Sequence, residues 1–276
     1  MSQQISPKAE VHPDAIIGKN VVIEAFARID KEVSIGDGSW IASNATIYSG
    51  AKIGKNCKIF PGAVISAIPQ DLKFKGEISF VEIGNNTIIR ESVTINRGTA
   101  AKSVTRIGDN SLLMAYSHIA HDCVIGNCCI LSNGVQVAGE VEIDDWAIIG
   151  GMSTIHQFCR IGKHVMVSGM SGILSDVPPF IKAAGIPVIY QGINYVGLKR
   201  REFTKEDIDS IHNIYRIIYQ EKLNTSQALE QIDKSIENSP HKKEILTFIK
   251  SSKRGIIKKS TGGKSNKYNN HSEEEI

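Results

Sequence analysis

A branched aliphatic residue recurs at every sixth position over most of this chain, and this period constrains the fold more than any other feature. The first run consists of Ile5, Val11, Ile17, Ile23, Ile29, Ile35, Ile41, Ile47, Ile53, Ile59 and Ile65. The period returns at Ile83, Ile89 and Ile95, and again from Ile107 to Ile173 with only Ile, Leu or Val at the sixth position. A period of six fits neither an α-helix nor the alternation of a simple strand.

The period instead predicts short strands joined by tight turns. Three six-residue units make one turn of a triangular coil, with one aliphatic side chain from each face pointing inward. A small residue follows four positions after most of the aliphatic ones, as Ala27, Ala45 and Ala63 do, and leaves room for a corner. Glycines such as Gly36 and Gly54 follow directly after the aliphatic residue, where we expect them to relieve backbone strain.

The chain therefore divides into a mainly β part and a helical part. We predict a parallel β-helix over residues 1–190, from which loops leave the coil at about 66–82 and 99–106. The repeat ends near residues 176–179, and the stretch from there to about 201 is predicted to be irregular. A small α-helical domain is expected at 191–256, with a capping box at 204–207 before one helix and further helices at 225–238 and 241–252. The polar tail, 257–276, is predicted to be disordered.

Composition excludes several classes of function. The net charge of +3 is small and scattered, which argues against nucleic-acid binding. No apolar stretch approaches the roughly 18 residues needed to span a bilayer, so we expect no stable membrane insertion, and no secretory signal is recognisable. The five cysteines, Cys57, Cys123, Cys128, Cys129 and Cys159, are an odd number. We expect reduced thiols, a cytoplasmic protein, and neither a metal site nor a cofactor.

The coil converts sequence spacing into proximity. Residues 18 positions apart should stack about 4.8 Å from each other, the distance between adjacent strands. Gly139 then lies one turn after His121, and Glu140 one turn after Asp122. An imidazole beside a carboxylate can act as a general base, because the carboxylate sets its tautomer and stabilises the imidazolium. The N–H of Gly139 could stabilise an oxyanion. We interpret His12 and His164, by contrast, as surface residues without a role.

Several segments resemble the UDP-N-acetylglucosamine 3-O-acyltransferase family over residues 5–256. They read QDLK at 70–73, IRESVTI at 89–95, HIAHDC at 118–123, IGGM at 149–152, IHQF at 155–158 and GLKRR at 197–201. The resemblance implies a left-handed β-helix, a homotrimer, and active sites between neighbouring subunits. It also implies transfer of an (R)-3-hydroxyacyl chain from acyl carrier protein to the 3-hydroxyl of UDP-N-acetylglucosamine, the first step of lipid A biosynthesis.

The same resemblance assigns roles to individual residues. His121 matches the general base, Asp122 the residue that orients it, and Gly139 the oxyanion donor. The residues that match substrate-binding positions are Gln70, Asp71, Lys73, His118, Glu140, His156, Gln157, Asn194, Arg200 and Arg201. The basic run at 199–201 suits an acidic carrier protein. Gly169 matches the position that limits acyl length, and its missing side chain predicts a chain of about fourteen carbons or more.

The sequence departs from the family pattern at four positions. Glu140 and Asn96 replace histidines, Val196 replaces an acidic residue, and Pro187 stands where histidine is common. These changes leave the contacts to the sugar and the acyl chain open, including the choice between UDP-N-acetylglucosamine and an amino-sugar variant.

Three alternative functions fit parts of this sequence pattern. The N-acyltransferase of the same pathway carries a preceding nucleotide-binding domain, for which a repeat starting at Ile5 leaves no room. A γ-type carbonic anhydrase needs three metal-binding histidines, for which His118, His121 and His156 are candidates. A non-catalytic assembly scaffold would have no use for the pairing of His121 with Asp122.

Overall fold

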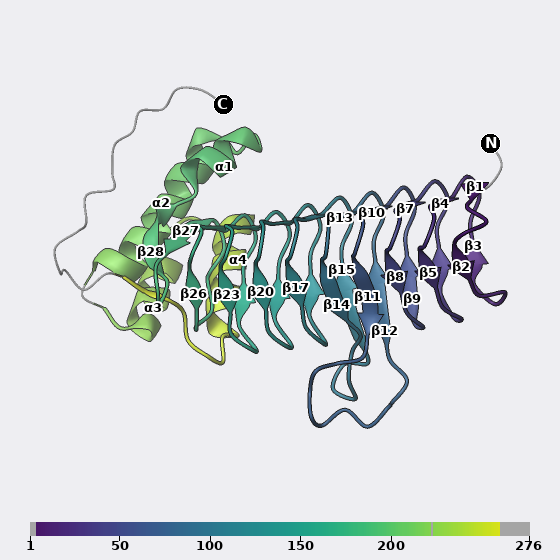
Figure 1. The fold of residues 1–276 in the computed structure, drawn as a ribbon. Coiled ribbons are helices and arrows are strands. Elements are labelled where there is room, and N and C mark those ends of the chain that lie inside the picture. Colours follow the sequence, from purple (N-terminus) through teal and green to yellow (C-terminus); the bar gives the residue numbers. More distant parts are fainter. Residues whose placement is uncertain (1–3, 222, 260–276) are drawn as a thin grey trace.

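The computed structural model describes residues 4–221 and 223–259, in which short strands wind into a three-sided coil that helices follow (Figure 1). Each side of the coil is a sheet, because each strand pairs in parallel with the strands one turn earlier and one turn later. Most strands contain only two residues, since the chain turns a corner after each of them. The predicted parallel β-helix of six-residue repeats is confirmed.

The described part of the chain forms three sheets. The first contains β1 (Gln4–Ile5), β4 (Val22–Ile23), β7 (Trp40–Ile41), β10 (Lys58–Ile59), β13 (Ile88–Ile89), β16 (Leu112–Leu113), β19 (Ile130–Leu131), β22 (Ile148–Ile149), β25 (Met166–Val167), β27 (Ile181–Ala184), β28 (Ile189–Ile193) and β29 (Lys258–Lys259). The second contains β2 (Glu10–Val11), β5 (Arg28–Ile29), β8 (Thr46–Ile47), β11 (Val64–Ala67), β14 (Thr94–Asn96), β17 (His118–Ile119), β20 (Gln136–Val137), β23 (Thr154–Ile155) and β26 (Gly172–Ile173). The third contains β3 (Ile16–Ile17), β6 (Ser34–Ile35), β9 (Ala51–Ile53), β12 (Phe80–Ile83), β15 (Val104–Ile107), β18 (Val124–Ile125), β21 (Glu142–Ile143) and β24 (Arg160–Ile161).

The aliphatic residues of the six-residue period form the core. Ile23, Ile41 and Ile59 occupy successive turns of the first sheet in direct register, and each is buried. Burying one such side chain contributes about 1.5–3 kcal/mol relative to leaving it exposed. The core is therefore a set of stacked columns rather than a single cluster, and every turn of the coil contributes to it.

Two excursions leave the coil, and the parallel register continues past them apart from one irregularity between Ile65 and Ala67 of β11. The first lies between β11 and β12, where Ala51 pairs with Val81 instead of a residue 18 positions later. The second lies between β14 and β15, and Thr94 pairs with His118 across it. The first excursion projects from the side of the coil in Figure 1. The loops are slightly shorter than predicted, because β11, β12 and β15 extend into the expected ranges.

The repeated glycines act by close packing rather than by backbone conformation. Gly36 does not adopt a positive φ angle, so the predicted relief of backbone strain is wrong for it. A Cβ atom at Gly36 would instead lie 2.6 Å from the carbonyl carbon of Gly54 in the next turn. Glycine is required there because successive corners approach too closely for any side chain.

The chain after the coil is more regular than predicted. The stretch to residue 201 contains β27, an antiparallel partner in β28, and a short helix, α1 (Tyr195–Arg200). The predicted helices follow as α2 (Lys205–Gln220), α3 (Thr225–Ser235) and α4 (Pro240–Lys250), and Thr204 forms the expected capping box with Asp207. Of the predicted disordered tail, Lys258 and Lys259 form β29 beside β28, and residues 260–276 lie outside the described residues.

Candidate active site

His121 and Asp122 form a hydrogen-bonded pair at the corner that follows β17. His121 Nδ1 lies 2.9 Å from Asp122 Oδ2. Because a carboxylate can only accept, the proton of the imidazole sits on Nδ1, and Nε2 keeps a free lone pair. The Asp122 side chain is fully buried, while 11% of the His121 side chain is exposed. The pair therefore presents one basic nitrogen at the surface and keeps its partner carboxylate away from water.

The backbone at Asp122 is part of this arrangement. Asp122 adopts φ of 60°, in the left-handed region that aspartate tolerates better than most residues. Its N–H donates to the hydroxyl of Thr105 at 2.8 Å. The left-handed turn thus fixes the main chain of Asp122, and the carboxylate reaches back to Nδ1 of His121.

Gly139 lies against the His121 ring from the next turn of the coil, as the spacing of 18 residues predicts. A Cβ atom at Gly139 would stand 2.5 Å from His121 Nε2 and 2.6 Å from Cε1. Among the described residues, no acceptor receives a hydrogen bond from the Gly139 N–H. An unpaired backbone donor beside a basic nitrogen has the geometry that an oxyanion site needs.

The first excursion brings Asp71 to this pair. Asp71 Oδ2 lies 3.9 Å from His121 Nε2, and its Oδ1 accepts the N–H of Lys73 at 2.9 Å. Gln70 and Lys73 are exposed on either side of Asp71. Glu77 accepts the N–H of Ala100 at 3.0 Å and so ties the first excursion to the second.

The remaining histidines of the predicted cluster differ in their surroundings. His118 is half-buried in β17, and its Nδ1 lies 2.7 Å from the hydroxyl of Thr94. Burial lowers the pKa of His118, which favours its neutral form. His156 is exposed, and its Nδ1 lies 3.0 Å from the carbonyl oxygen of the half-buried Gln157. No described group of three His, Cys, Asp or Glu residues is arranged to hold a metal ion.

Glu140 lies one turn above Asp122. Its N–H donates to the carbonyl oxygen of His121 at 2.9 Å, which holds the two corners in register. The side chain of Glu140 lines a hollow together with Lys102, Glu142, Phe158, Arg160, Asp176, Ser251, Lys253 and Arg254. Glu140 thus joins the His121 corner to a charged depression that reaches the end of α4.

Asn194 and Arg201 hold the helical domain against the coil. Asn194 caps α1, since its Oδ1 accepts from the N–H of Gly197 at 3.2 Å, and its Nδ2 donates to the carbonyl oxygen of His164 at 2.9 Å. Arg201 lies over the ring of Trp146 at 5.0 Å and donates to the carbonyl oxygen of Trp146 at 3.2 Å. Arg200 is exposed and is therefore the more accessible of the two predicted arginines.

The interpretation of His164 as a surface residue without a role is wrong. Its ring stacks between those of Trp146 and Phe180, with centroids 6.2 and 5.7 Å away, and meets Phe203 edge-on. Burial, followed by the nearby charge of Arg201, lowers its pKa to about 4. His164 is a neutral packing residue at the junction of the coil and the helices.

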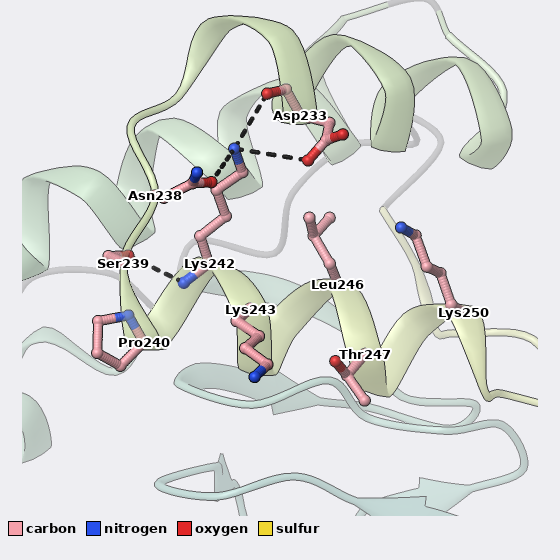
Figure 2. Close-up of a pocket in the computed structure, with 9 residues that line it drawn as sticks. All are labelled: Asp233, Asn238, Ser239, Pro240, Lys242, Lys243, Leu246, Thr247 and Lys250. Carbon is pink, nitrogen blue, oxygen red and sulfur yellow. Dashed lines mark hydrogen bonds and ion pairs between the residues drawn. The ribbon is translucent and has the colours of Figure 1, made fainter.

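A separate hollow lies within the helical domain and holds none of the predicted site residues. Lys242 lines this hollow, and Figure 2 shows its Nζ reaching Asp233 and Asn238. Lys242 is buried, and its Nζ also donates to the carbonyl oxygen of Ile236 at 2.7 Å. Lys242 therefore closes the carboxyl end of α3.

None of the described helices is long and apolar enough to cross a membrane.

Comparisons with known proteins agree on one family. Residues 176–257 match the second domain of UDP-N-acetylglucosamine O-acyltransferase, and residues 32–67 and 105–139 match the bacterial transferase hexapeptide repeat. The structure of LpxA, a UDP-N-acetylglucosamine acyltransferase from Bacteroides fragilis, is 54% identical, with a TM-score of 0.91 over 92% of this chain and 99% of that one. The chain belongs to the UDP-N-acetylglucosamine acyltransferase family. This membership confirms the predicted acyltransferase activity and the predicted left-handed sense of the coil.

Two further members of this family are more distant relatives. The Francisella novicida UDP-N-acetylglucosamine acyltransferase is 39% identical, with a TM-score of 0.91 over 94% of this chain and 95% of that one. The Arabidopsis UDP-N-acetylglucosamine acyltransferase is 32% identical, with a TM-score of 0.77 over 92% of this chain and all of that one. Each similarity covers both the coil and the helical domain, so this acyltransferase shares the combination of the two parts with these relatives.

The sequence did not reveal which residues surround Asp122 in this acyltransferase. The hydroxyl and N–H of Thr99 and the N–H of Lys102 all donate to the Asp122 carboxylate. Thr99 precedes Asp122 by 23 positions, because the second excursion intervenes, and a spacing of 18 would not find it. The predicted second excursion was the only sequence feature that pointed toward these donors to Asp122, because it starts beside the site.

Proposed function

We propose that this chain transfers an (R)-3-hydroxyacyl group from acyl carrier protein to the 3-hydroxyl of UDP-N-acetylglucosamine, the first step of lipid A biosynthesis. Membership of the family supports the reaction class and the acceptor. The observation that carries the proposal is the His121–Asp122 pair, whose free Nε2 faces Asp71 of the first excursion. This arrangement supplies a base for a hydroxyl acceptor.

The proposed reaction needs one proton transfer and one leaving group. His121 Nε2 removes the proton of the sugar hydroxyl while its oxygen attacks the thioester carbonyl carbon. The carbonyl oxygen becomes negative and accepts a hydrogen bond from the Gly139 N–H. When the tetrahedral intermediate collapses, the carbon–sulfur bond breaks and the imidazolium returns its proton to the thiolate. Asp122 stabilises the imidazolium between these steps.

Binding of the acceptor is assigned to the groups around this base. Asp71 is the candidate for contact with the sugar, and Gln70 and Lys73 extend that surface along the first excursion. His118, Glu140, His156 and Gln157 are proposed to line the substrate cleft, and Asn194 and Arg201 to lie near the nucleotide. Arg200, which is exposed beside Lys199, suits the acidic surface of a carrier protein.

We also propose that the active protein is a homotrimer. The first excursion exposes three large apolar side chains, with 63% of Ile68, all of Leu72 and 83% of Ile78 open to solvent. Met152 and Met170 are similarly exposed at a corner of the coil. Exposed apolar surface of this kind is expected where subunits meet. Light scattering should give a mass of three times 30.2 kDa, and a monomer would contradict this proposal.

The cytoplasm is the proposed location. All five cysteines are free, and four of them are buried within the coil. Unpaired thiols persist in a reducing compartment.

Direct assay tests the reaction. The purified protein is incubated with UDP-N-acetylglucosamine and 3-hydroxyacyl carrier proteins of graded chain length, beside the variant His121→Ala. We expect acylated sugar nucleotide from the wild type and a loss of at least about 100-fold in the variant. An arm with the 3-amino analogue of the acceptor measures acceptor preference. No product from any donor would contradict the reaction, and full activity of His121→Ala would contradict the mechanism.

A further inference from the structure

The carboxylate of Asp122 is enclosed by donors that come almost entirely from the second excursion. The N–H of Thr99 lies 3.0 and 3.1 Å from its two oxygens, and the N–H of Lys102 lies 3.1 Å from Oδ1. The hydroxyl of Thr99 makes the shortest contact, 2.6 Å to Oδ2. Thr99 is itself buried. A single residue thus provides both a backbone and a side-chain donor to the partner of the candidate base.

The proton of the Thr99 hydroxyl has a defined direction. The same oxygen accepts the N–H of Ala101 at 3.2 Å. A hydroxyl has one proton to donate, and its acceptor side is occupied by Ala101, so that proton points at Asp122. The turn that makes this contact begins at Gly98, where a Cβ atom would collide with the backbone N of Val104.

Thr99 and His121 share one oxygen of the carboxylate. Oδ2 accepts from His121 Nδ1 at 2.9 Å and from the Thr99 hydroxyl at 2.6 Å. Each donor withdraws charge from that oxygen, so the hydroxyl limits how strongly Oδ2 stabilises an imidazolium at His121. It also prevents the carboxylate from rotating away from the ring.

We propose that Thr99 is a positioning residue for acyl transfer: its hydroxyl orients the Asp122 carboxylate and sets how readily His121 holds a proton. This inference rests on the proposed function. Thr99 touches neither of the reacting groups and acts only through Asp122.

Few other charges lie around the pair. Asp71 faces His121 Nε2 at 3.9 Å, and Glu140 lies in the next turn. Lys102 directs its side chain away to Glu142, at 3.0 Å. Burial raises the pKa of Cys123 to about 12, so its thiol stays neutral beside Asp122. None of these groups replaces the donor that Thr99 supplies.

The test compares Thr99→Val, which removes the hydroxyl, with Thr99→Ser, which keeps it. Thr87→Val is the matched control, because Thr87 is also buried but its hydroxyl donates to the carbonyl oxygen of Gly108, away from Asp122. The value of kcat/KM for acyl transfer is measured as a function of pH, with thermal unfolding measured beside it.

We expect Thr99→Val to lose about tenfold or more in kcat/KM, as for a hydrogen bond to a charged group. Without the hydroxyl, Oδ2 stabilises the imidazolium more strongly, so the acid limb of the pH profile moves to higher pH. Thr99→Ser should keep the wild-type profile and most of the activity, and Thr87→Val should leave the profile in place. An unmoved profile in Thr99→Val, or the same shift in Thr99→Ser, would overturn the proposal.

The test also covers a variant that does not fold and a wild type that shows no activity. If Thr99→Val does not fold, Thr99→Ala replaces it. If the wild type forms no product, the proposed function fails, and Thr99 is then judged by the modification of His121 with diethyl pyrocarbonate. That reagent attacks the unprotonated ring, and mass spectrometry of the His121 peptide follows the rate against pH. An unchanged midpoint in the variant overturns the role of Thr99 without reference to turnover.

Discussion

Gly139 supports the ring of His121 from one turn above, so closely that a Cβ atom there would lie 2.5 Å from Nε2. The absence of a side chain at Gly139 therefore determines where the basic nitrogen stands. The same contact places the unpaired N–H of Gly139 next to that nitrogen. The position of the candidate base and that of the proposed oxyanion donor are thus linked.

Gly139→Ala should lower kcat by about 100-fold, because displacing a catalytic group by about 1 Å costs that much. The melting temperature should change little, since the ring can move toward solvent. Gly172→Ala is the control: its Cβ would meet only the side chain of Ile186, at 3.2 Å. Steady-state kinetics and thermal unfolding of both variants check this, and an active Gly139→Ala would mean that the ring is not held from above.

Gly169 should determine acyl-chain length in a graded manner. It is exposed, and an added Cβ would lie 3.2 Å from the carbonyl oxygen of Gly151 in the preceding turn, so a side chain there requires a shift of a few tenths of an ångström. We expect the wild type to prefer chains of about fourteen carbons or more, Gly169→Ala somewhat shorter ones, and Gly169→Met the shortest, since each excluded methylene is worth about 1–3 kcal/mol. Competition between donors in one reaction measures the preference. A ten-carbon preference in the wild type would remove the assignment.

Ile59→Ala should destabilise the coil by about 2–5 kcal/mol, because it opens a cavity in a column that has no other side chain to fill it. Ile16→Ala removes the same atoms from a side chain that is 72% exposed, and its effect should stay within about 0.5 kcal/mol. Chemical denaturation of the two variants measures the difference. Equal losses would show that the outer surface of the coil, rather than its columns, holds it together.

The stability of the protein should fall as the pH is lowered through the range set by His164. Its pKa is 6.5 when free and about 4 in the folded protein. The unfolded chain therefore binds more protons between these values, and the stabilising contribution of the neutral ring is lost from pH 6.5 down to about 4. Melting temperatures of the wild type and of His164→Phe, which keeps the stack but cannot titrate, should diverge over this range. His212→Phe, at an exposed position, should follow the wild type.

The coil could be predicted because its period records a physical repeat: one inward aliphatic residue per face. The stacking of His121, Asp122 and Gly139 followed from the same arithmetic. Thr99 could not be found in this way, since its contact with Asp122 crosses an excursion whose path no period describes. The roles assigned to the individual site residues remain predictions for the experiments above.

Other errors came from assigning a cause to a pattern without its surroundings. Gly36 was explained by its own backbone, whereas the backbone of Gly54 in the next turn is what requires it. His164 was judged alone, but its environment comes from Trp146 and from Phe203, which lie far from it in the chain. The hairpin of β27 and β28 escaped notice because it follows the point at which the period ends.

The register of the coil across its two excursions has an evolutionary consequence. Ala51 still pairs with Val81, and Thr94 with His118, although a loop leaves the coil between the members of each pair. A loop inserted at a corner therefore leaves the core columns above and below it in place. Mutation can lengthen, shorten or replace such loops without changing the fold of the coil. A scaffold of this type can therefore acquire new substrates while its architecture stays constant.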